Sequence, residues 1–264
     1  MRQQPYEIVR PGVEDVPALL RALAEKYETP EFVRDDPVRF VHAAKGDANR
    51  ETTGFVAAAL SYGSRPQFLA KIAEIVDAAG GDVHGWVLAQ GWRDMFRQDD
   101  PSCFYRIFPR SKMAMFFEAL HGILGEFGTL GAFARAGAGD AVGTVEAFCK
   151  AFSVSGCAPV VPQDTASACK RLCMFMRWMV RTGSPVDIGL WGGWIDRRSL
   201  VVPLDVHVAQ EAHKLGLLYS KAPTMQSALG LTLRLAEIFP DDPLKGDFAL
   251  YGLGVDKEAK RGLP

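Results

Sequence analysis

A helical spacing of apolar residues recurs along nearly the whole chain and constrains the fold more than any other feature. Residues 64–79 place Phe68, Ile72 and Ile75 on one face, and residues 112–127 repeat this pattern. Because the spacing matches the period of an α-helix, both segments predict amphipathic helices. Further helices are expected at 14–27, 31–44, 50–62, 82–96, 140–154, 167–181, 205–217 and 224–239.

The alternation of apolar and polar residues that is typical of β-strands is scarce. Residues 160–161 and 200–202 are too short to build a sheet. We therefore predict an all-α fold of two interlocked helical subdomains, with a helix-hairpin-helix-like element and a cleft between them. One subdomain is expected to span residues 52–183, and the other to combine residues 1–51 with 184–264.

Composition narrows the class of protein. The 264 residues carry a formal charge of −1, which argues against a uniformly basic surface for nucleic acid. An anionic ligand would have to meet a local basic patch instead. No apolar run approaches the roughly 18 residues that cross a bilayer, and the start of the chain lacks the apolar core of a secretion signal. We expect a cytoplasmic protein without membrane contact.

The five cysteines, an odd number without a CxxC pair, are poorly suited to a disulfide framework or a zinc site. We expect reduced thiols that behave as small buried hydrophobes, and no bound metal.

A group of cations follows one side of the helix expected at 167–181. At 100° per residue, Arg177 and Arg181 each lie about 20° from Lys170, on opposite sides. Such a stripe is consistent with a solvated face. It is also consistent with a surface that meets phosphates, because cations without acids among them repel one another. The sequence leaves both interpretations open.

Asp205 precedes another helical run, so its carboxylate is placed to cap the free N–H groups of that helix. A lysine and a carboxylate that a fold brings together can carry out covalent imine chemistry on a sugar. Lys170 and Asp205 are therefore the candidate catalytic pair. Capping and catalysis are compatible, since both need an ionised carboxylate that is held rigidly.

Two segments around this pair resemble a known superfamily. Lys170 opens a helix, and PLDVHV at 203–208 opens another that ends in KLGLL. This arrangement resembles the helix-hairpin-helix superfamily of base-excision DNA glycosylases, and the long connector between the two is similar in layout to archaeal 8-oxoguanine glycosylases. The chain also resembles an uncharacterised bacterial family of conserved hypothetical proteins, through AALSYG at 58–63, FYRIF at 104–108, SACKRL at 167–172, RWMVR at 177–181, PLDVHV at 203–208 and GDFALYGLG at 246–254.

The resemblance implies a DNA repair glycosylase with AP lyase activity. Its substrate would be double-stranded DNA with an oxidised base such as 8-oxoguanine. Lys170 would be the nucleophile and Asp205 its acidic partner. The residues expected to line the base pocket, or to fill the gap left by an extruded base, are Tyr62, Gly63, Cys173, Met174, His207, Asp247 and Phe248.

The resemblance also implies contacts with the nucleic-acid backbone. In the superfamily, glycines before the lysine let backbone N–H groups approach a phosphate closely. This chain has DTASA at 164–168 instead, so hydroxyls would have to act as donors. The expected contact residues are Arg171, Arg177, Arg181, Arg197, Arg198, Thr165 and Ser167.

No cysteine follows Asp205, where an iron–sulfur cluster would need its ligands, so no cluster is expected. No other cofactor is expected either.

Two other functions stay open at this point. The missing hairpin glycines favour a catalytically inactive nucleic-acid-binding module on the same scaffold. A helical protein-interaction protein, whose basic stripe meets an acidic partner, is the other alternative. The sequence does not indicate the lesion, the choice between DNA and RNA, or the oligomeric state.

Overall fold

The computed structural model describes residues 15–137 and 139–261, and helices make up nearly all of the regular secondary structure within them. Strands β1 (Cys103–Tyr105) and β2 (Phe108–Pro109) pair antiparallel in a short hairpin. The predicted all-α class is confirmed. The α-helices are α1 (Val16–Tyr27), α2 (Val38–Ala43), α3 (Asp47–Leu60), α4 (Arg65–Ala78), α5 (Val83–Leu88), α6 (Arg110–Phe127), α7 (Leu130–Gly137), α8 (Ala141–Ser153), α9 (Lys170–Val180), α10 (Val206–Lys214), α11 (Met225–Ile238) and α12 (Lys245–Arg261). Short 3-10 turns are η1 (Pro30–Asp35), η2 (Gly91–Asp94) and η3 (Arg197–Ser199).

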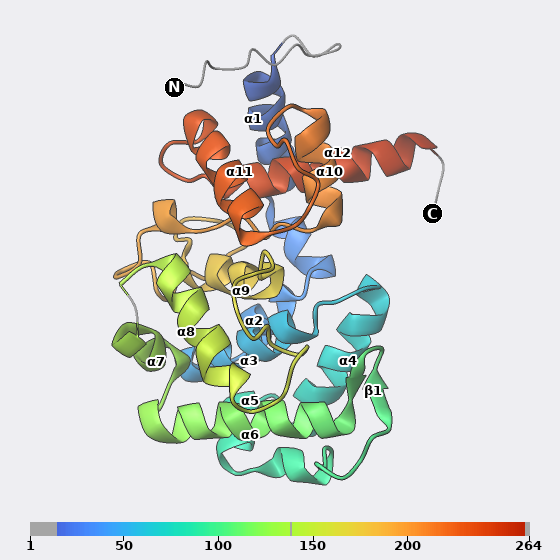
Figure 1. Ribbon diagram of the computed structural model, residues 1–264, viewed down its shortest axis with the longest axis vertical. Helices are drawn as coiled ribbons and strands as arrows, with labels where there is room; N and C mark the ends of the chain where they lie inside the picture. Colours follow the sequence, from blue (N-terminus) through green and yellow to red (C-terminus); the bar gives the residue numbers. More distant parts are fainter. Residues whose placement is uncertain (1–14, 138, 262–264) are drawn as a thin grey trace.

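Helix α9 lies between two groups of helices (Figure 1). In the upper group of that view, both α1 and α10 contact α12. In the lower group, α3 contacts α2, α4, α5 and α7, and α6 contacts α5, α7 and α8. Helix α9 itself contacts α3 and α8. Within the described ranges, none of the helices combines the length and the apolar character that crossing a bilayer requires.

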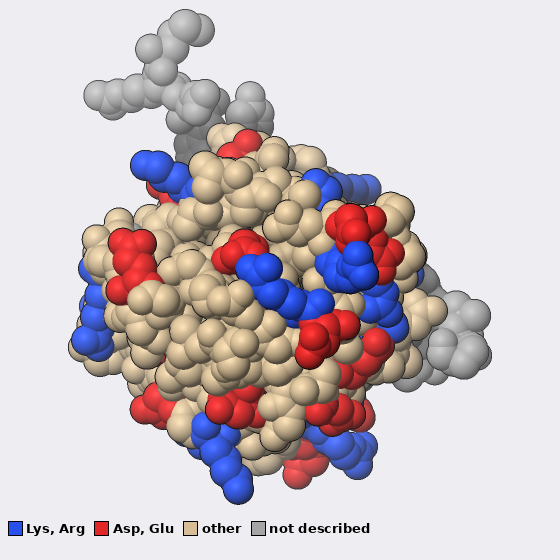
Figure 2. All heavy atoms as spheres, turned by 90° about the horizontal axis from the view of Figure 1, so that it is seen from below, with Lys and Arg blue, Asp and Glu red and all other residues tan. Residues whose placement is uncertain are grey.

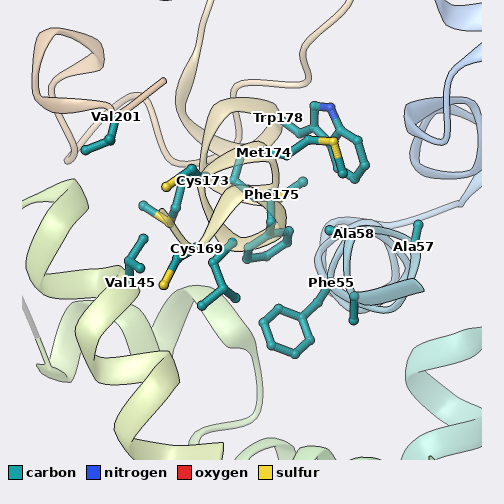
Figure 3. Close-up of a cluster of buried hydrophobic side chains, with 14 of the residues drawn as sticks. Phe55, Ala57, Ala58, Val145, Cys169, Cys173, Met174, Phe175, Trp178 and Val201 are labelled. Atoms are coloured by element: carbon teal, nitrogen blue, oxygen red, sulfur yellow. The ribbon is translucent and has the colours of Figure 1, made fainter. Parts of the chain in front are cut away.

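Helix α9 is enclosed along most of its length, since every residue from Leu172 to Val180 is buried. It can approach α3 closely because α3 has a glycine at the crossing. A Cβ atom at Gly54 would lie 3.2 Å from the Met179 Cε atom, tighter than an ordinary contact. The ring of Phe175 meets the ring of Phe55 edge to face, at 5.2 Å between centroids (Figure 3). Packing of this kind fixes the direction of α9 and the place where it begins.

The predicted division into subdomains remains a prediction. A boundary between residues 51 and 52 would fall inside α3, which spans Asp47–Leu60 as one helix. The connection between α8 and α9 is also longer than the tight turn of a hairpin, because residues 154–169 separate the two helices. The helix-hairpin-helix element of the sequence analysis therefore stays a prediction as well.

The Trp-rich connector after α9 is tied to the core by a buried carboxylate. Glu51 Oε1 accepts a hydrogen bond from Trp191 Nε1 at 2.8 Å, and Glu51 Oε2 accepts one from the backbone N–H of Gly131 at 2.8 Å. The Trp191 ring packs edge to face on Phe175, with 5.3 Å between centroids. Glu51 thus joins α3, α7 and the connector at one point.

We expect Glu51→Leu to lower the free energy of unfolding by about 2–6 kcal/mol, because two buried N–H donors lose their acceptor and each costs about 1–3 kcal/mol. Urea denaturation followed by circular dichroism measures this change. The matched variant Glu51→Gln keeps one acceptor oxygen, and its free energy of unfolding should fall distinctly less. A Glu51→Leu protein as stable as the wild type would contradict the role given to this carboxylate.

Candidate active site

The structure brings Lys170 and Asp205 together from distant parts of the sequence. The Lys170 Nζ atom lies 2.7 Å from the Asp205 Oδ2 atom. The two side chains remain 40% and 29% exposed, so the ion pair can be reached from solvent. An amine and a carboxylate therefore face each other at an accessible edge of the protein.

Both partners are positioned by helix starts. Asp205 is the N-cap of α10, and its Oδ1 atom accepts a hydrogen bond from the backbone N–H of Val208 at 2.8 Å. One carboxylate oxygen thus caps the helix while the other meets the lysine. Lys170 is the first residue of α9, and the preceding Cys169 has a left-handed backbone with φ 46°. The burial of α9 fixes the origin of the lysine side chain.

The electrostatics of the pair favour an ionised carboxylate. Burial opposes ionisation of Asp205, but the adjacent Lys170 ammonium, its hydrogen bond and the N–H of Val208 outweigh burial and lower the pKa of Asp205 below its ordinary 3.8. His207, exposed on the first turn of α10, acts in the same direction.

Arg177 and Arg181 do not form a surface stripe with Lys170, and that interpretation is wrong. Their exposed fractions are 5% and 1%. Arg177 pairs with Asp187 and Asp247, and Arg181 pairs with Asp187, Asp242 and Glu28. Buried guanidiniums that are already bonded to carboxylates cannot reach a phosphate. The physical reason is the all-round burial of α9, which leaves no solvent face for these side chains.

The expected pocket residues Asp247 and Phe248 belong to the same buried cluster. Asp247 accepts from the Arg177 guanidinium, and the Phe248 ring lies 4.6 Å from the Arg177 guanidinium carbon and 5.3 Å from that of Arg181. Both residues are enclosed, at 7% and 1% exposure. They stabilise the ion cluster through charge and cation–π contact, and neither is open to a nucleobase in this structure.

Tyr62 and Gly63 lie at an accessible edge, directly after α3. Tyr62 is 42% exposed, and the Arg106 guanidinium lies 5.7 Å from its ring centroid. Gly63 has a left-handed backbone with φ 81°, which favours glycine, and a Cβ atom there would come within 2.9 Å of that guanidinium. The Arg171 guanidinium donates to the carbonyl of Ala59 near the end of α3, which links this edge to the start of α9. Tyr62 and Lys170 are therefore held on neighbouring helix ends.

The other predicted contact residues have mixed surroundings. Arg171 also donates to the Pro159 carbonyl at 2.7 Å, Arg197 donates to the Asp241 carbonyl at 2.8 Å, and Arg198 pairs with Asp196 at 2.5 Å. Ser167 is exposed and Thr165 half-buried, both on the segment before α9. Figure 2 shows that basic and acidic side chains alternate over the lower end of the molecule, without a continuous basic surface.

Cys173 and Met174 point to the interior instead of an open pocket. Cys173 is buried and its thiol donates to the Ala168 carbonyl at 3.5 Å, while Met174 is 9% exposed. A cavity of about 660 Å³ opens near the far end of α9, where Arg21, Arg181 and Lys245 contribute to its lining. Lys170 and Asp205 do not line it, so it is not the base pocket predicted beside this pair.

Three of the acids that neutralise the buried arginines were not expected from the sequence. Glu28, Asp187 and Asp242 lie in separate segments without a shared motif, so only the fold collects them. One signal was present: Arg177 and Arg181 stand on a helix whose remaining residues after Arg171 are all apolar. That context favours buried ion pairs, because a helix without a polar face has no solvent side.

Comparison with known proteins places the chain in a family. Residues 36–256 match the family described as Protein of unknown function (DUF2400), and the chain belongs to this family. No curated protein and no solved structure matches it.

We expect Asp187→Ala to lower the free energy of unfolding by about 3–5 kcal/mol, because it leaves both buried guanidiniums short of a partner. Urea denaturation measures the change. Asp99→Ala removes the partner of exposed Arg97 and serves as the matched control, with little expected effect. Equal effects of the two substitutions would show that the buried cluster does not hold α9.

The ion pair at the candidate site predicts a pH dependence. Because the pKa of Asp205 is lowered in the folded protein, its charge contributes stability above pH 3.8, and that contribution is lost as the pH falls through the folded value. Asp205→Asn keeps the capping oxygen and removes the charge. The wild type should therefore be the more stable at neutral pH, and the difference in unfolding free energy should close below pH 3.8. A difference that is independent of pH would contradict this account.

Proposed function

We propose that this chain is a DNA glycosylase with AP lyase activity that acts on duplex DNA containing an oxidised base such as 8-oxoguanine. The observation that carries the proposal is the contact of 2.7 Å between Lys170 Nζ and Asp205 Oδ2 at a solvent-accessible edge. An amine with a carboxylate beside it is the minimum that imine chemistry on a sugar requires. The resemblance of the surrounding segments to helix-hairpin-helix glycosylases selects DNA as the substrate.

The proposed chemistry uses the amine of Lys170 and the ionised carboxylate of Asp205. Lys170 loses its proton to water and attacks the anomeric carbon of the flipped nucleotide, while Asp205 stabilises the positive charge that develops on the sugar. The bond from that carbon to the base breaks, and the base leaves with the electron pair. Opening of the sugar ring gives an imine with Lys170. Removal of a proton from the adjacent sugar carbon then expels the 3′ phosphate.

The start of α9 offers a place for the DNA backbone. The first N–H groups of an α-helix have no partner within the helix, and Cys169, the N-cap residue, makes no side-chain capping hydrogen bond. A phosphate beside these groups would lie next to the Lys170 side chain. Exposed Ser167 precedes them and adds a hydroxyl donor. This arrangement supports DNA binding without the superfamily's glycines.

A second candidate is a nucleic-acid-binding module without catalysis. Asp164, exposed in the segment before α9, favours it because a carboxylate there repels a phosphate and disfavours close docking. The burial of Arg177 and Arg181 also removes two of the cations that the sequence assigned to DNA. Under this alternative, binding persists in Lys170→Gln, and the wild type forms no covalent adduct.

Borohydride trapping on duplexes with 8-oxoguanine and other oxidised bases tests the proposal. We expect a covalent protein–DNA adduct with the wild type that disappears in Lys170→Ala and falls by about a hundredfold or more in Asp205→Asn, because loss of one catalytic group typically costs this much. Lys214→Ala, which removes an exposed lysine paired with Glu211 at 2.6 Å, should leave the adduct unchanged.

Two results would overturn the proposal. One is the absence of adduct and of base release across the whole panel of lesions, while the protein remains folded by circular dichroism. The other is an adduct that survives in Lys170→Ala, since a different amine would then carry the chemistry.

A further inference from the structure

Two thiols from different segments lie next to each other at the start of α9. Cys149 of α8 and Cys169, the N-cap residue of α9, have their Sγ atoms 3.9 Å apart. Figure 3 shows Cys169 on the side of α9 that faces α8, near Val145. Both thiols also lie within reach of the Asp164 carbonyl oxygen, at 3.6 Å from Cys149 Sγ and 3.3 Å from Cys169 Sγ.

The pair is enclosed but lies close beneath the surface. Cys149 and Cys169 are 2% and 3% exposed. Their cover on one side is the segment before α9, where Gln163, Asp164, Ala166 and Ser167 are all exposed. The Ser167 Oγ atom lies 3.8 Å from Cys169 Sγ. The sulfur atoms thus lie against a segment whose own side chains reach solvent.

We propose that Cys149 and Cys169 form a redox modification site, at which hydrogen peroxide converts the two thiols to a disulfide. In the first step the Cys169 thiolate attacks a peroxide oxygen, the O–O bond breaks, and with one proton the products are a sulfenic acid and water. In the second step the Cys149 sulfur attacks the sulfenic sulfur, the S–O bond breaks, and a second water leaves with the Cys149 proton. Two thiols are oxidised by two electrons in total, and one peroxide is reduced to two waters.

The surroundings assign different roles to the two sulfur atoms. The hydrogen bond from Cys149 lowers the pKa of Cys169, against the effect of burial, and the Ser167 hydroxyl adds to this. The same hydrogen bond, together with burial, raises the pKa of Cys149. These surroundings favour Cys169 as the thiol that attacks peroxide first, with Cys149 as the resolving thiol.

The other buried cysteines are poor competitors. Burial raises the pKa of Cys173 and that of Cys157. Among the described residues, Cys157 hydrogen-bonds through its thiol to the Phe152 carbonyl and not to another sulfur atom. Neither environment favours the thiolate that reacts with peroxide.

Formation of the disulfide would move the start of α9. The sulfur atoms must approach from 3.9 Å to about 2.05 Å, and Cys169 directly precedes Lys170. Cys169 is also held in a left-handed conformation that non-glycine residues rarely adopt, so a pull on its side chain acts on a strained backbone. Oxidation therefore shifts the lysine relative to Asp205 and lowers any activity that depends on this pair.

Peptide mapping after treatment with hydrogen peroxide tests the proposal in the full chain. The mapping should be carried out in the Cys103→Ser variant, because this substitution removes the exposed thiol. After alkylation of the remaining thiols, trypsin should release a peptide ending at Lys150 that is linked to a peptide ending at Lys170. The mass of the linked species should be two hydrogens below the summed masses of the two peptides. We expect this link to form about tenfold faster than any oxidation of Cys173.

Matched variants assign the link, because Cys157 and Cys169 share the peptide of residues 151–170. The link should persist in Cys157→Ser and disappear in Cys169→Ser and in Cys149→Ser. In Cys149→Ser, Cys169 should instead advance to sulfinic acid, since it has lost its resolving thiol.

Failure to form the link in the folded wild type, or a link that requires Cys157, would overturn the proposal. This mapping does not depend on catalysis, so it separates failure of the redox site from failure of the proposed glycosylase. If the wild type does form a borohydride adduct, peroxide should lower its yield, and a thiol reductant should restore it. An adduct yield that is unchanged in the linked protein would show that the link does not act on Lys170.

Discussion

A buried cluster of ion pairs at the end of α9 is the interaction on which the rest of the structure depends. Arg177 and Arg181 would each cost several kcal/mol if they were left unpaired away from water. The fold therefore has to bring them carboxylates, and it takes these from the end of α1, from the connector after α9 and from around the start of α12. Segments that are far apart in sequence are joined through two side chains of one helix.

This constraint at one end of α9 determines what is presented at the other end. With the helix fixed by guanidiniums at its end and by aromatic packing on α3 along its length, its first residue has a defined place. Lys170 is that residue, and Asp205 meets it from the capped start of α10. A long flexible side chain becomes a useful reactive group when its origin and its partner are both held. Under the redox proposal, a disulfide between Cys149 and Cys169 at the same helix start would change this geometry.

Much of the architecture could be predicted from sequence, because helical periodicity is a local property. The helices around residues 64–79 and 112–127, and Asp205 as the cap of α10, follow from spacing and side-chain chemistry alone. The contact between Lys170 and Asp205 was expected from the resemblance to a known superfamily, because no local sequence pattern connects the two residues. Arg177 and Arg181 were misinterpreted for a related reason: their partners lie tens of residues away or more, with the exception of nearby Asp187. Helical geometry places a charge on a face but does not say whether another element covers that face.

The contact between Lys170 and Asp205 has functional meaning only if a sugar can be placed beside the amine. A crystal structure of the full chain with duplex DNA containing a stable abasic-site analogue would test this most directly. The account predicts that the Lys170 Nζ atom lies within about 3.5 Å of the sugar carbon that carried the base, the distance of a reactive arrangement. A duplex bound on another surface, with the amine still paired to Asp205 and remote from the sugar, would contradict it.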